Sequence, residues 1–489
     1  MAKKPRSQRR KKGGSFDDGR GGGVSTESSF DGDVLSESHT IANSDDITFD
    51  DPGWDDGIGG GGEDDDDDLM GASSNSIQSS QASAEARHAK LLETLNQVDD
   101  IPTEKRSAKR ESSLRLLYRS LTQHATGTIG TDAVVSKLDG ITTACKYVLR
   151  VGGPSEQYAA CRVLEAASIV LGPGSSDYYD SIHTLLWRVC QSKNKAVPVR
   201  IAAIRALAMS NFIGSNDDVS TENLLDDFEL VAAKEYRGET VPSNLRAAAL
   251  DCWALLSTTI EDLYIAGKDD VSTGRGLVML GLLQECLDDS NIQLRSAAGE
   301  CVALIHEARL NLGINQNEGE NTTERQFRRG TWEGSEWEET FDLIQQRISE
   351  LSVESGHHMS KKAKKEQRAT FREFQATIVD DETPEEVVNF RGGTLELSTW
   401  SEIVQLNFIR HCLQSGFQIQ LLTNSTLQTI FGANGKLLNE FGGYSQLEKR
   451  LLLSKTSGAA KAADMDLTRK RRTRTNVKNH FLTADGEDI

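Results

Sequence analysis

Aromatic residues are scarce in this sequence: Phe, Trp and Tyr make up only 6% of its 489 residues. A hydrophobic core must therefore rest on Leu, Ala, Val and Ile, and small Ala-rich cores are typical of stacked helices. No run approaches the roughly 18 apolar residues that a membrane-spanning helix needs. The basic N-terminus, MAKKPRSQRRKKGG, has no apolar segment behind it, so we do not expect a secretory signal or a membrane partner.

Cysteine motifs are also missing. The seven cysteines are odd in number, include no CxxC pair and are scattered: Cys145, Cys161, Cys190, Cys252, Cys286, Cys301 and Cys412. This pattern favours reduced thiols in the cytosol or the nucleus over a disulfide framework or a zinc site.

Catalytic motifs are likewise absent. The sequence contains no GxxxxGK[ST], GxSxG or HExxH. His306 falls inside an apolar repeat and is interpreted as a core or groove histidine, and His357 and His358 are too isolated for a metal site. The sequence therefore predicts a non-enzyme without cofactor, metal or small-molecule substrate.

Charge is abundant but unevenly distributed over a chain whose formal net charge is −19. The first twelve residues hold seven Lys or Arg and no acid, whereas residues 13–70 hold eighteen Asp or Glu against one Arg. Residues 1–83 are rich in Gly, Ser and Asp and have few apolar residues. They cannot bury enough surface to offset the entropy of ordering, so we predict a disordered segment, first basic and then acidic.

Internal repetition is the main structural signal after residue 84. Four similar segments are EQYAACRVLEAASIVLG from Glu156, PVRIAAIRALAMSNFIG from Pro198, SNLRAAALDCWALLSTT from Ser243 and IQLRSAAGECVALIHEA from Ile292. Arg200, Arg246 and Arg295 align at spacings of 46 and 49 residues, close to the roughly 40–47 residue period of HEAT and armadillo repeats. These arginines are interpreted as structural, pairing with carboxylates or helix ends. Each segment carries an Ala pair that lets neighbouring helices approach closely.

The sequence thus predicts an all-α fold, an armadillo/HEAT-like α-solenoid over residues 84–355 with an extended concave surface for partners. Residues 356–389 follow as a basic connecting helix and linker, with Phe371 and Phe374 as anchors. A smaller C-terminal unit covers residues 390–454, and its core candidates are Leu395, Leu397, Trp400, Leu406, Phe408 and Ile409. Within it, GFQIQLLTN is compatible with a short strand or a helix end.

A basic tail ends the chain over residues 455–489. Its candidate RNA-binding residues are Lys455, Lys461, Arg469, Lys470, Arg471, Arg472, Arg474 and Lys478. With few aromatic residues among them, phosphate neutralisation is expected to dominate over the reading of bases. Two other interpretations stay open: KRRTR as a nuclear localisation signal, and a solvated charged tail.

A second candidate set lies in the connecting helix. Lys361, Lys365, Arg368 and Arg372 recur at i, i+4, i+7 and i+11, which places them on one stripe of a helix. The alternative is a solubilising face. If this stripe and the tail converge, they form one cationic surface on an acidic protein.

Several segments resemble the interferon-related developmental regulator family. The likeness is carried by KKEQRATFREF at 364–374, FRGGTLELSTWSEIVQLNFIRHCLQSGFQIQLLTNSTLQTIFG at 390–432 and YSQLEKRLLLS at 444–454. VLGPG at 170–174 and RSAAGECVALIHE at 295–307 are similar to the family's armadillo-like region.

The resemblance implies a non-enzymatic protein with a small C-terminal family domain. It implies a factor on translationally inactive ribosomes, whose basic C-terminal helix lies in the path of mRNA and tRNA, or a transcriptional co-regulator. We therefore expect the ribosome and rRNA as partners of a cytoplasmic protein that restrains translation. The alternative is a nuclear scaffold for transcription-regulatory proteins.

Overall fold

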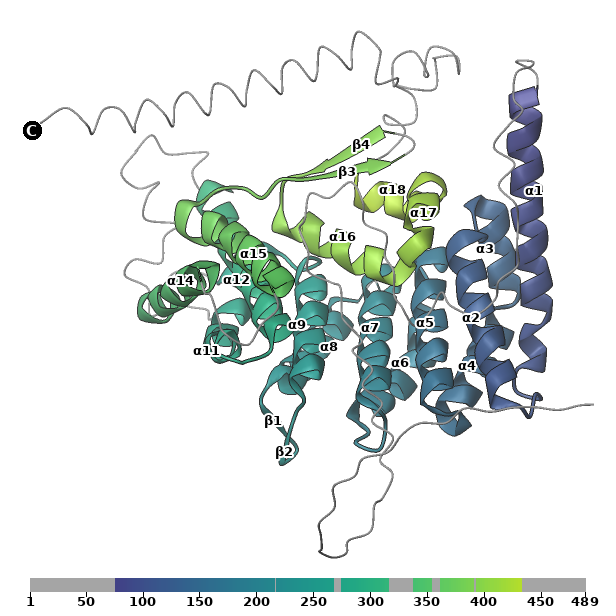
Figure 1. The fold of residues 1–489 in the computed structure, drawn as a ribbon, viewed down its shortest axis with the longest axis horizontal. Coiled ribbons are helices and arrows are strands. Elements are labelled where there is room, and N and C mark those ends of the chain that lie inside the picture. Colours follow the sequence, from purple (N-terminus) through teal and green to yellow (C-terminus); the bar gives the residue numbers. More distant parts are fainter. Residues whose placement is uncertain are drawn as a thin grey trace, which may run out of the picture. The chain divides into compact units, whose positions relative to one another are not determined.

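Helices packed side by side make up most of the fold (Figure 1). The computed structural model describes residues 75–432, apart from 216, 268–273, 316–336, 354–360 and 391–392. Within these residues the predicted all-α solenoid is confirmed. Most of the predicted disordered segment and the whole basic tail lie outside the described residues.

A central row of helices carries the repeats. It consists of α2 (Ser107–Gln123), α5 (Pro154–Leu171), α7 (Val197–Gly214), α9 (Ser243–Ser257) and α12 (Ile292–Asn315). Each of these helices contacts the next (Figure 1). The four sequence repeats are therefore four neighbouring helices, and their Ala pairs are buried as predicted.

An outer row covers one side of the central row. It consists of α4 (Leu138–Val151), α6 (Ser176–Gln191), α8 (Asp218–Ala232) and α11 (Arg275–Leu287). These helices are amphipathic: α8, for example, buries Leu224, Leu225 and Phe228 and exposes Asp218 and Glu222. One apolar face is enough because only one side of each outer helix meets the central row.

The repeat arginines tie the two rows together. Arg200 Nε donates a hydrogen bond to the carbonyl of Cys190, at the end of α6, at 2.7 Å. Arg246 Nε does the same to the carbonyl of Ala232, at the end of α8, also at 2.7 Å. Cations at a helix C-terminus satisfy its free carbonyls and complement its dipole. The predicted pairing with helix ends is therefore confirmed for Arg200 and Arg246. Arg295 Nη2 donates instead to the side chain of Gln367 on α15 at 2.9 Å.

Further helices pack at the two ends of the central row: α1 (Asn75–Asn96), η1 (Val98–Asp100), α3 (Gly127–Ser136), α10 (Asp262–Ala266), α14 (Glu338–Val353) and α15 (Lys361–Asp380). Helix α1 begins at Asn75, nine residues inside the segment predicted to be disordered. Those residues include no Gly or Pro, so nothing in them stops the helix from extending toward the N-terminus.

The C-terminal elements cover the other side of the central row. They are β3 (Glu386–Phe390), β4 (Gly393–Leu397), α16 (Trp400–Leu413), η2 (Gln414–Gly416), α17 (Phe417–Thr423) and α18 (Ser425–Ile430). Helix α16 crosses α5, α9 and α12, and α17 contacts α2 (Figure 1). The core candidates from Leu395 to Ile409 are all buried, as predicted. The solenoid surface expected to receive partners is therefore occupied, along α16, by the chain itself.

Two sequence interpretations are corrected here. The strand interpretation of GFQIQLLTN is wrong, because this segment forms α17 and buries Phe417, Gln420 and Leu421 at helical spacing. Two antiparallel hairpins were not predicted: β1 (Glu235–Tyr236) with β2 (Glu239–Thr240), and β3 with β4. Their sequence signal was an Arg-Gly pair between short alternating runs, at 237–238 and at 391–392.

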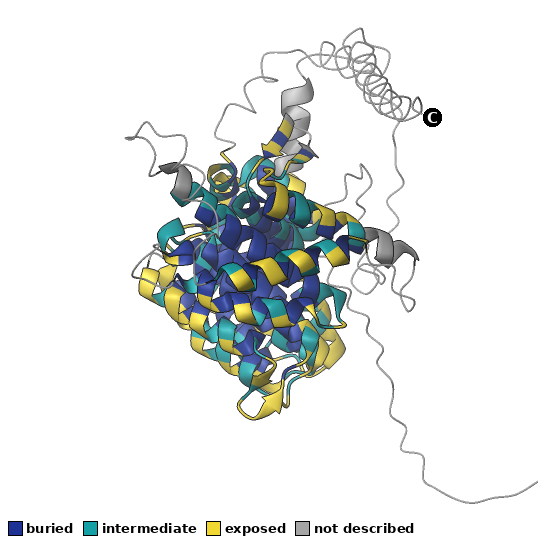
Figure 2. Ribbon diagram, turned by 90° about the vertical axis from the view of Figure 1, so that its left-hand side faces the viewer, coloured by how far each residue is buried: buried dark blue, intermediate teal, exposed yellow. Residues whose placement is uncertain are grey.

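Three helices of the central row, α5, α7 and α9, are buried around almost their whole circumference. Every residue of α9 from Leu245 to Ser257 is buried, and α5 and α7 are nearly as enclosed (Figure 2). By length and composition α7 could cross a membrane, which the sequence analysis did not anticipate, but 72% of it is buried within the fold. An all-round apolar helix here marks the middle layer of a protein core.

Phe408→Ala tests the covering role of α16. Phe408 is 4% exposed, so its truncation leaves a cavity, and we expect the unfolding free energy to fall by about 3–5 kcal/mol. Urea denaturation followed by circular dichroism measures this. Val387→Ala on β3, at a side chain 47% exposed, is the control and should change stability by less than about 0.5 kcal/mol. Equal effects of the two variants would contradict the role of α16.

Candidate nucleic-acid interface

The predicted RNA-binding residues are only partly within the described structure. The eight tail cations from Lys455 to Lys478 lie outside the described residues. Lys361 and Lys365 belong to α15, but only the backbone is described there. The side chains of Arg368 and Arg372 are described. The predicted helix over all four stripe positions is confirmed, and the convergence of stripe and tail stays a prediction.

Aromatic side chains anchor α15 to the solenoid, as predicted. Phe371 and Phe374 are buried and meet edge to face, with ring centroids 5.5 Å apart. Phe374 also contacts Trp400 of α16 at 5.3 Å between centroids. Gly299 of α12 makes room for this ring, because a Cβ there would lie 2.6 Å from Phe374.

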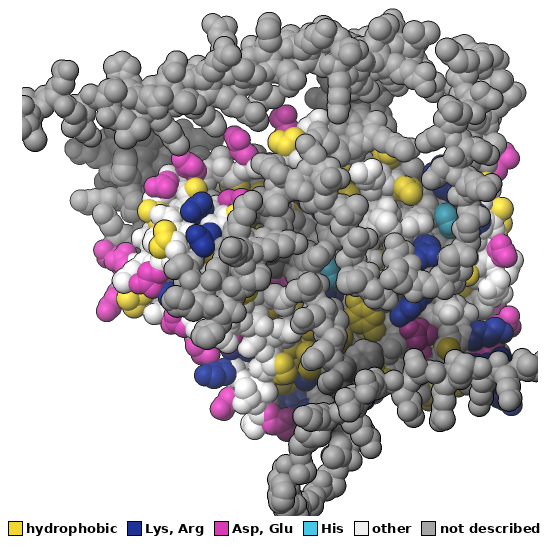
Figure 3. Space-filling model, in the orientation of Figure 1, with side chains coloured by type: hydrophobic (Ala, Val, Ile, Leu, Met, Phe, Trp, Pro, Cys, Tyr) yellow, Lys and Arg dark blue, Asp and Glu magenta, His cyan; other side chains and the backbone are white. Residues whose placement is uncertain are grey.

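The two described stripe residues differ in exposure. Arg372 is exposed, whereas Arg368 is half-buried and its Nε is enclosed with no hydrogen-bond partner in the described structure. Around them the surface is acidic: in Figure 3, Asp and Glu side chains gather over the end of the fold that α11, α14 and α15 form. Arg372 is therefore the better-placed cation of this pair for a polyanion.

Two sets of hydrogen bonds hold the N-terminus of α16. Thr399 and Glu402 form a capping box: the Thr399 hydroxyl accepts from the Glu402 amide, and Glu402 accepts from the Thr399 amide. Glu307 of α12 also accepts from the Trp400 amide at 2.7 Å. Burial raises the pKa of Glu307 to about 7, although the Trp400 and Ser401 amides favour its charged form.

Buried donors from the central row hold the C-terminus of α16. Arg162 of α5 donates to the carbonyls of His411 at 2.7 Å and Cys412 at 3.2 Å. Tyr118 of α2 donates to the Cys412 carbonyl at 2.7 Å. Arg162 is itself paired with Glu165 at 2.5 Å, and both side chains are almost completely buried. The last carbonyls of α16 thus have charged and phenolic partners instead of water.

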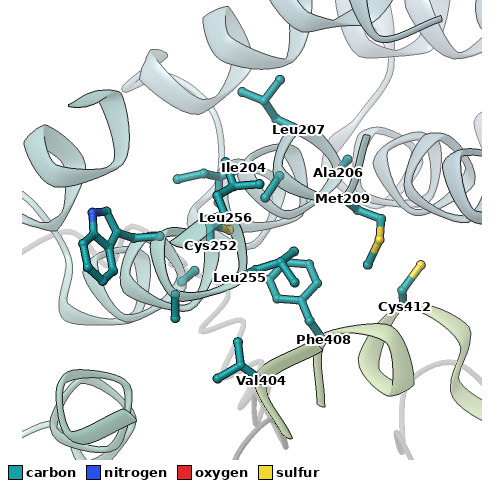
Figure 4. Close-up of a cluster of buried hydrophobic side chains, with 14 of the residues drawn as sticks. Ile204, Ala206, Leu207, Met209, Cys252, Leu255, Leu256, Val404, Phe408 and Cys412 are labelled. Carbon is teal, nitrogen blue, oxygen red and sulfur yellow. The ribbon is translucent and has the colours of Figure 1, made fainter. Parts of the chain in front are cut away.

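The middle of α16 packs on α7 and α9. Val404, Phe408 and Cys412 point toward Ile204, Met209 and Leu255 of those helices (Figure 4). Beneath them Arg205 of α7 pairs with Asp251 of α9 at 2.6 Å. The Arg205 guanidinium carbon lies 5.3 Å from the centroid of the Phe408 ring, a cation–π contact in a dry environment.

Amide side chains fix the segment after α16. Gln420 of α17 is buried, and its Nε2 donates to three carbonyls at the end of α2, those of Leu121, Thr122 and Ala125. Asn424 caps α18 and donates to the Ile169 carbonyl of α5 at 3.0 Å. Close by, Gly172 has φ +75°, and a Cβ there would lie 2.7 Å from Thr426 Oγ1. The chain is therefore attached to the solenoid up to α18.

Sequence reasoning predicted pairing for the aligned arginines Arg200, Arg246 and Arg295, but it did not consider Arg162 and Arg205. A signal was present, since Arg162 and Arg205 occupy apolar stretches 43 residues apart, at the repeat spacing. Their partners on α16 lie 203–250 residues away along the chain. Such pairs are set by tertiary packing and leave no local pattern.

Reactive groups in the described structure serve packing. All seven cysteines are free and buried, and burial raises their thiol pKa, for Cys145 to about 12. They are thus protonated at neutral pH. His306 stacks on Phe341, bonds Asp381 at 2.8 Å and has a pKa lowered by burial, in agreement with its interpretation as a core histidine. The described side chains include no group of three that could hold a metal ion.

Arg162→Met should destabilise the fold strongly, because it leaves Glu165 buried and unpaired and frees the last carbonyls of α16. We expect a loss of about 3–5 kcal/mol of unfolding free energy, measured by urea denaturation. The double variant Arg162→Met, Glu165→Leu removes both charges and should recover much of the loss. If the unfolding free energy of Arg162→Met alone is within about 1 kcal/mol of the wild-type value, this explanation is wrong.

Glu307 predicts a pH dependence of stability. Its folded-state pKa of about 7 exceeds the usual 4.5, so its contribution is fully present below pH 4.5 and is lost as the pH rises through 7. We expect the unfolding free energy of the wild type, minus that of Glu307→Gln, to fall by about 2 kcal/mol between pH 4.5 and pH 7. Denaturation at a series of pH values measures this difference.

Glu350→Gln is the control, because its effect on stability should depend on pH in the opposite direction. Hydrogen bonds from Arg347 and Gln346 lower the pKa of the Glu350 carboxyl, so its contribution is present at neutral pH and lost in acid. If the unfolding free energy of the wild type, minus that of Glu307→Gln, does not change with pH or increases with pH, the raised pKa of Glu307 is contradicted.

Comparison with known proteins identifies the family. A family model described as "Interferon-related developmental regulator (IFRD)" matches residues 66–379, more than half of the chain. "Interferon-related developmental regulator 2" of Mus musculus is 24% identical over 408 residues, which cover 80% of this chain and 85% of that protein. "Interferon-related developmental regulator 1" of Mus musculus is 23% identical over 342 residues, which cover 68% and 69%. These names describe regulators and indicate no catalytic family. The chain belongs to the interferon-related developmental regulator family.

Proposed function

We propose that this protein is a non-enzymatic, ribosome-associated factor that restrains translation. Its basic C-terminal tail binds rRNA and, over residues 445–478, obstructs the path of mRNA and tRNA in inactive ribosomes. The observation that carries the proposal is the attachment of α16–α18 to the central helices. Because the chain is attached as far as α18, the cationic residues follow a fixed point on a rigid body.

The reach of the tail is bounded by chain length. Lys455 follows Gly432 by 23 residues, so it lies within roughly 80 Å of that point whatever the conformation between them. The region of highest charge, Arg469–Arg474, is further along the chain. An attached body with a cationic extension can hold its position on a large particle while the extension enters a channel.

The charge balance supports a restricted contact with RNA. The chain has formal charge −19 although both of its ends are basic, so the chain as a whole is repelled by a polyanion. Seven phosphate contacts by the tail would give a log–log salt slope of roughly −5 to −6. The arginines of the tail suit phosphate because their planar forks donate two parallel hydrogen bonds.

A nuclear transcriptional co-regulator is the second candidate. It is favoured by the names of the relatives, developmental regulators, and by KRRTR at 470–474, which has the composition of an import signal. In this case the solenoid is a scaffold for transcription-regulatory proteins. Nuclear accumulation that depends on Lys470, Arg471 and Arg472, without ribosome association, would favour it over the first proposal.

Sedimentation through a sucrose gradient tests the first proposal. We expect the full chain to travel with non-translating ribosomes, and a full chain with Arg469, Lys470, Arg471, Arg472 and Arg474 changed to Gln to be released. Loss of five phosphate contacts should reduce the magnitude of the salt slope by about 3.5–4.5.

The matched control neutralises five cations at the other end of the chain: Lys3, Lys4, Arg6, Arg9 and Arg10 changed to Gln. This variant should sediment like the wild type. If the tail variant also stays on the ribosome, the body does the docking and the role of the tail is wrong. If the wild type itself does not co-sediment, the ribosomal proposal is abandoned for the co-regulator.

A further inference from the structure

A second cationic surface lies on the folded body, where the end of α4, the loop from α6 to α7 and the β1–β2 hairpin meet. We call it the basic corner and define it by Arg150, Trp187, Arg188, Lys193, Lys195, Lys234, Tyr236 and Arg237. All its cations except half-buried Lys195 are exposed, and the two aromatic side chains are half-buried. Figure 2 shows the hairpin projecting from the helices as an exposed element.

Direct contacts join the three parts of the basic corner. Lys195 Nζ, in the loop after α6, donates to the carbonyl of Leu149 near the end of α4 at 3.1 Å. In the same loop Lys193 pairs with Glu239 of β2 at 2.5 Å. The corner is therefore one surface, although its residues span almost ninety positions of sequence.

A single amide organises the aromatic part of the basic corner. With its oxygen turned toward the surrounding donors, Gln191 accepts from Trp187 Nε1 at 2.7 Å, Tyr236 OH at 3.0 Å and Arg237 Nη2 at 3.2 Å. The two rings and the guanidinium are thus held in a fixed arrangement near the surface, before any ligand binds.

Arg237 occupies a costly backbone position. It has φ +52°, followed by Gly238 at +74°, so both central residues of the hairpin turn are in the region typical of a type I′ turn. Asn or Gly is favoured at the first of these positions. Arg237 instead places its guanidinium carbon 5.1 Å from the centroid of the Tyr236 ring. Strain kept at an exposed residue points to a role for its side chain.

The charge of the basic corner is opposite to that of the whole chain. It holds six cations, of which Lys193 pairs with Glu239 and Arg237 lies near Asp227. The salt bridge of Lys193 is solvent-exposed, with side chains 46% and 57% accessible, and is weak enough to be exchanged for a phosphate.

We propose that the basic corner binds single-stranded RNA, independently of the tail. Clustered cations with half-buried aromatic rings are the combination that single strands recognise: cations contact phosphates while unstacked bases lie on ring or guanidinium faces. An acidic peptide would use the cations but would have no use for Trp187 and Tyr236. Duplex RNA would offer phosphates but keep its bases stacked.

Arg237→Asn separates binding from folding. Asn-Gly is a preferred type I′ pair, so the variant should unfold at the same or a higher temperature than its parent. It also removes the guanidinium, so we expect an affinity for single-stranded RNA lower by roughly 3- to 10-fold. The measurement is fluorescence anisotropy with a labelled oligouridylate of about 12 nucleotides at 0.1 M salt. The parent is the full chain whose five cations between Arg469 and Arg474 are Gln, so the tail contributes little.

A graded series sharpens the test. Adding Lys193→Gln and Lys195→Gln to Arg237→Asn should lower affinity more than about tenfold and reduce the salt slope by about 2. Lys90→Gln, at an exposed lysine of α1, is the matched control and should change neither. Binding should also quench tryptophan fluorescence in the parent, and Trp187→Phe should remove most of that change.

Several results would overturn the proposal. They are an unchanged affinity in Arg237→Asn, an equal loss in Lys90→Gln, and tighter binding of a poly-glutamate peptide or an RNA duplex than of the oligouridylate. A negative result in the RNA-binding measurement does not affect the proposed ribosomal role of the tail, because the tail cations are neutralised in every variant of that series. Failure of the sedimentation experiment likewise leaves RNA binding by the basic corner to be measured by itself.

Discussion

Helices α5, α7 and α9 are enclosed on every side, and this enclosure determines how the other elements are arranged. A helix without a polar face must be covered on every side. The outer helices cover one flank of the central row, and α16 and α17 cover the other. The C-terminal segment is for this reason part of the solenoid core, and its removal would leave the faces of α7 and α9 that meet Val404, Phe408 and Cys412 open to water (Figure 4).

Polar groups within this layer need partners because water does not reach them. Arg162, Arg205 and Gln420 are almost completely buried, and they pair with helix ends and carboxylates. A buried ion pair often adds little net stability compared with apolar residues. Here the buried pairs fix the position of α16 on the central helices, because a shift of α16 would break several of them at once. The register of α16 thereby fixes where α17 and α18 lie on the central helices.

Two cationic regions of different kinds follow from this architecture. The tail is a run of Arg and Lys with few aromatic residues, suited to phosphates of any sequence. The basic corner has fewer cations but holds Trp187 and Tyr236 against one amide, Gln191. Elsewhere on the described surface, Asp and Glu side chains gather over the end of the fold that α11, α14 and α15 form (Figure 3).

The helical repeats, the structural role of their arginines Arg200, Arg246 and Arg295, and the aromatic anchors of α15 could all be predicted from the sequence. Each depends on local periodicity or on a repeat spacing that is visible along the chain. Only the tertiary structure decided where α16 lies, that Arg162 and Tyr118 hold its C-terminus, and that Lys193, Trp187 and Arg237 share one surface. These arrangements join residues up to 294 positions apart, and their free energy comes from burial and pairing that no single segment contains.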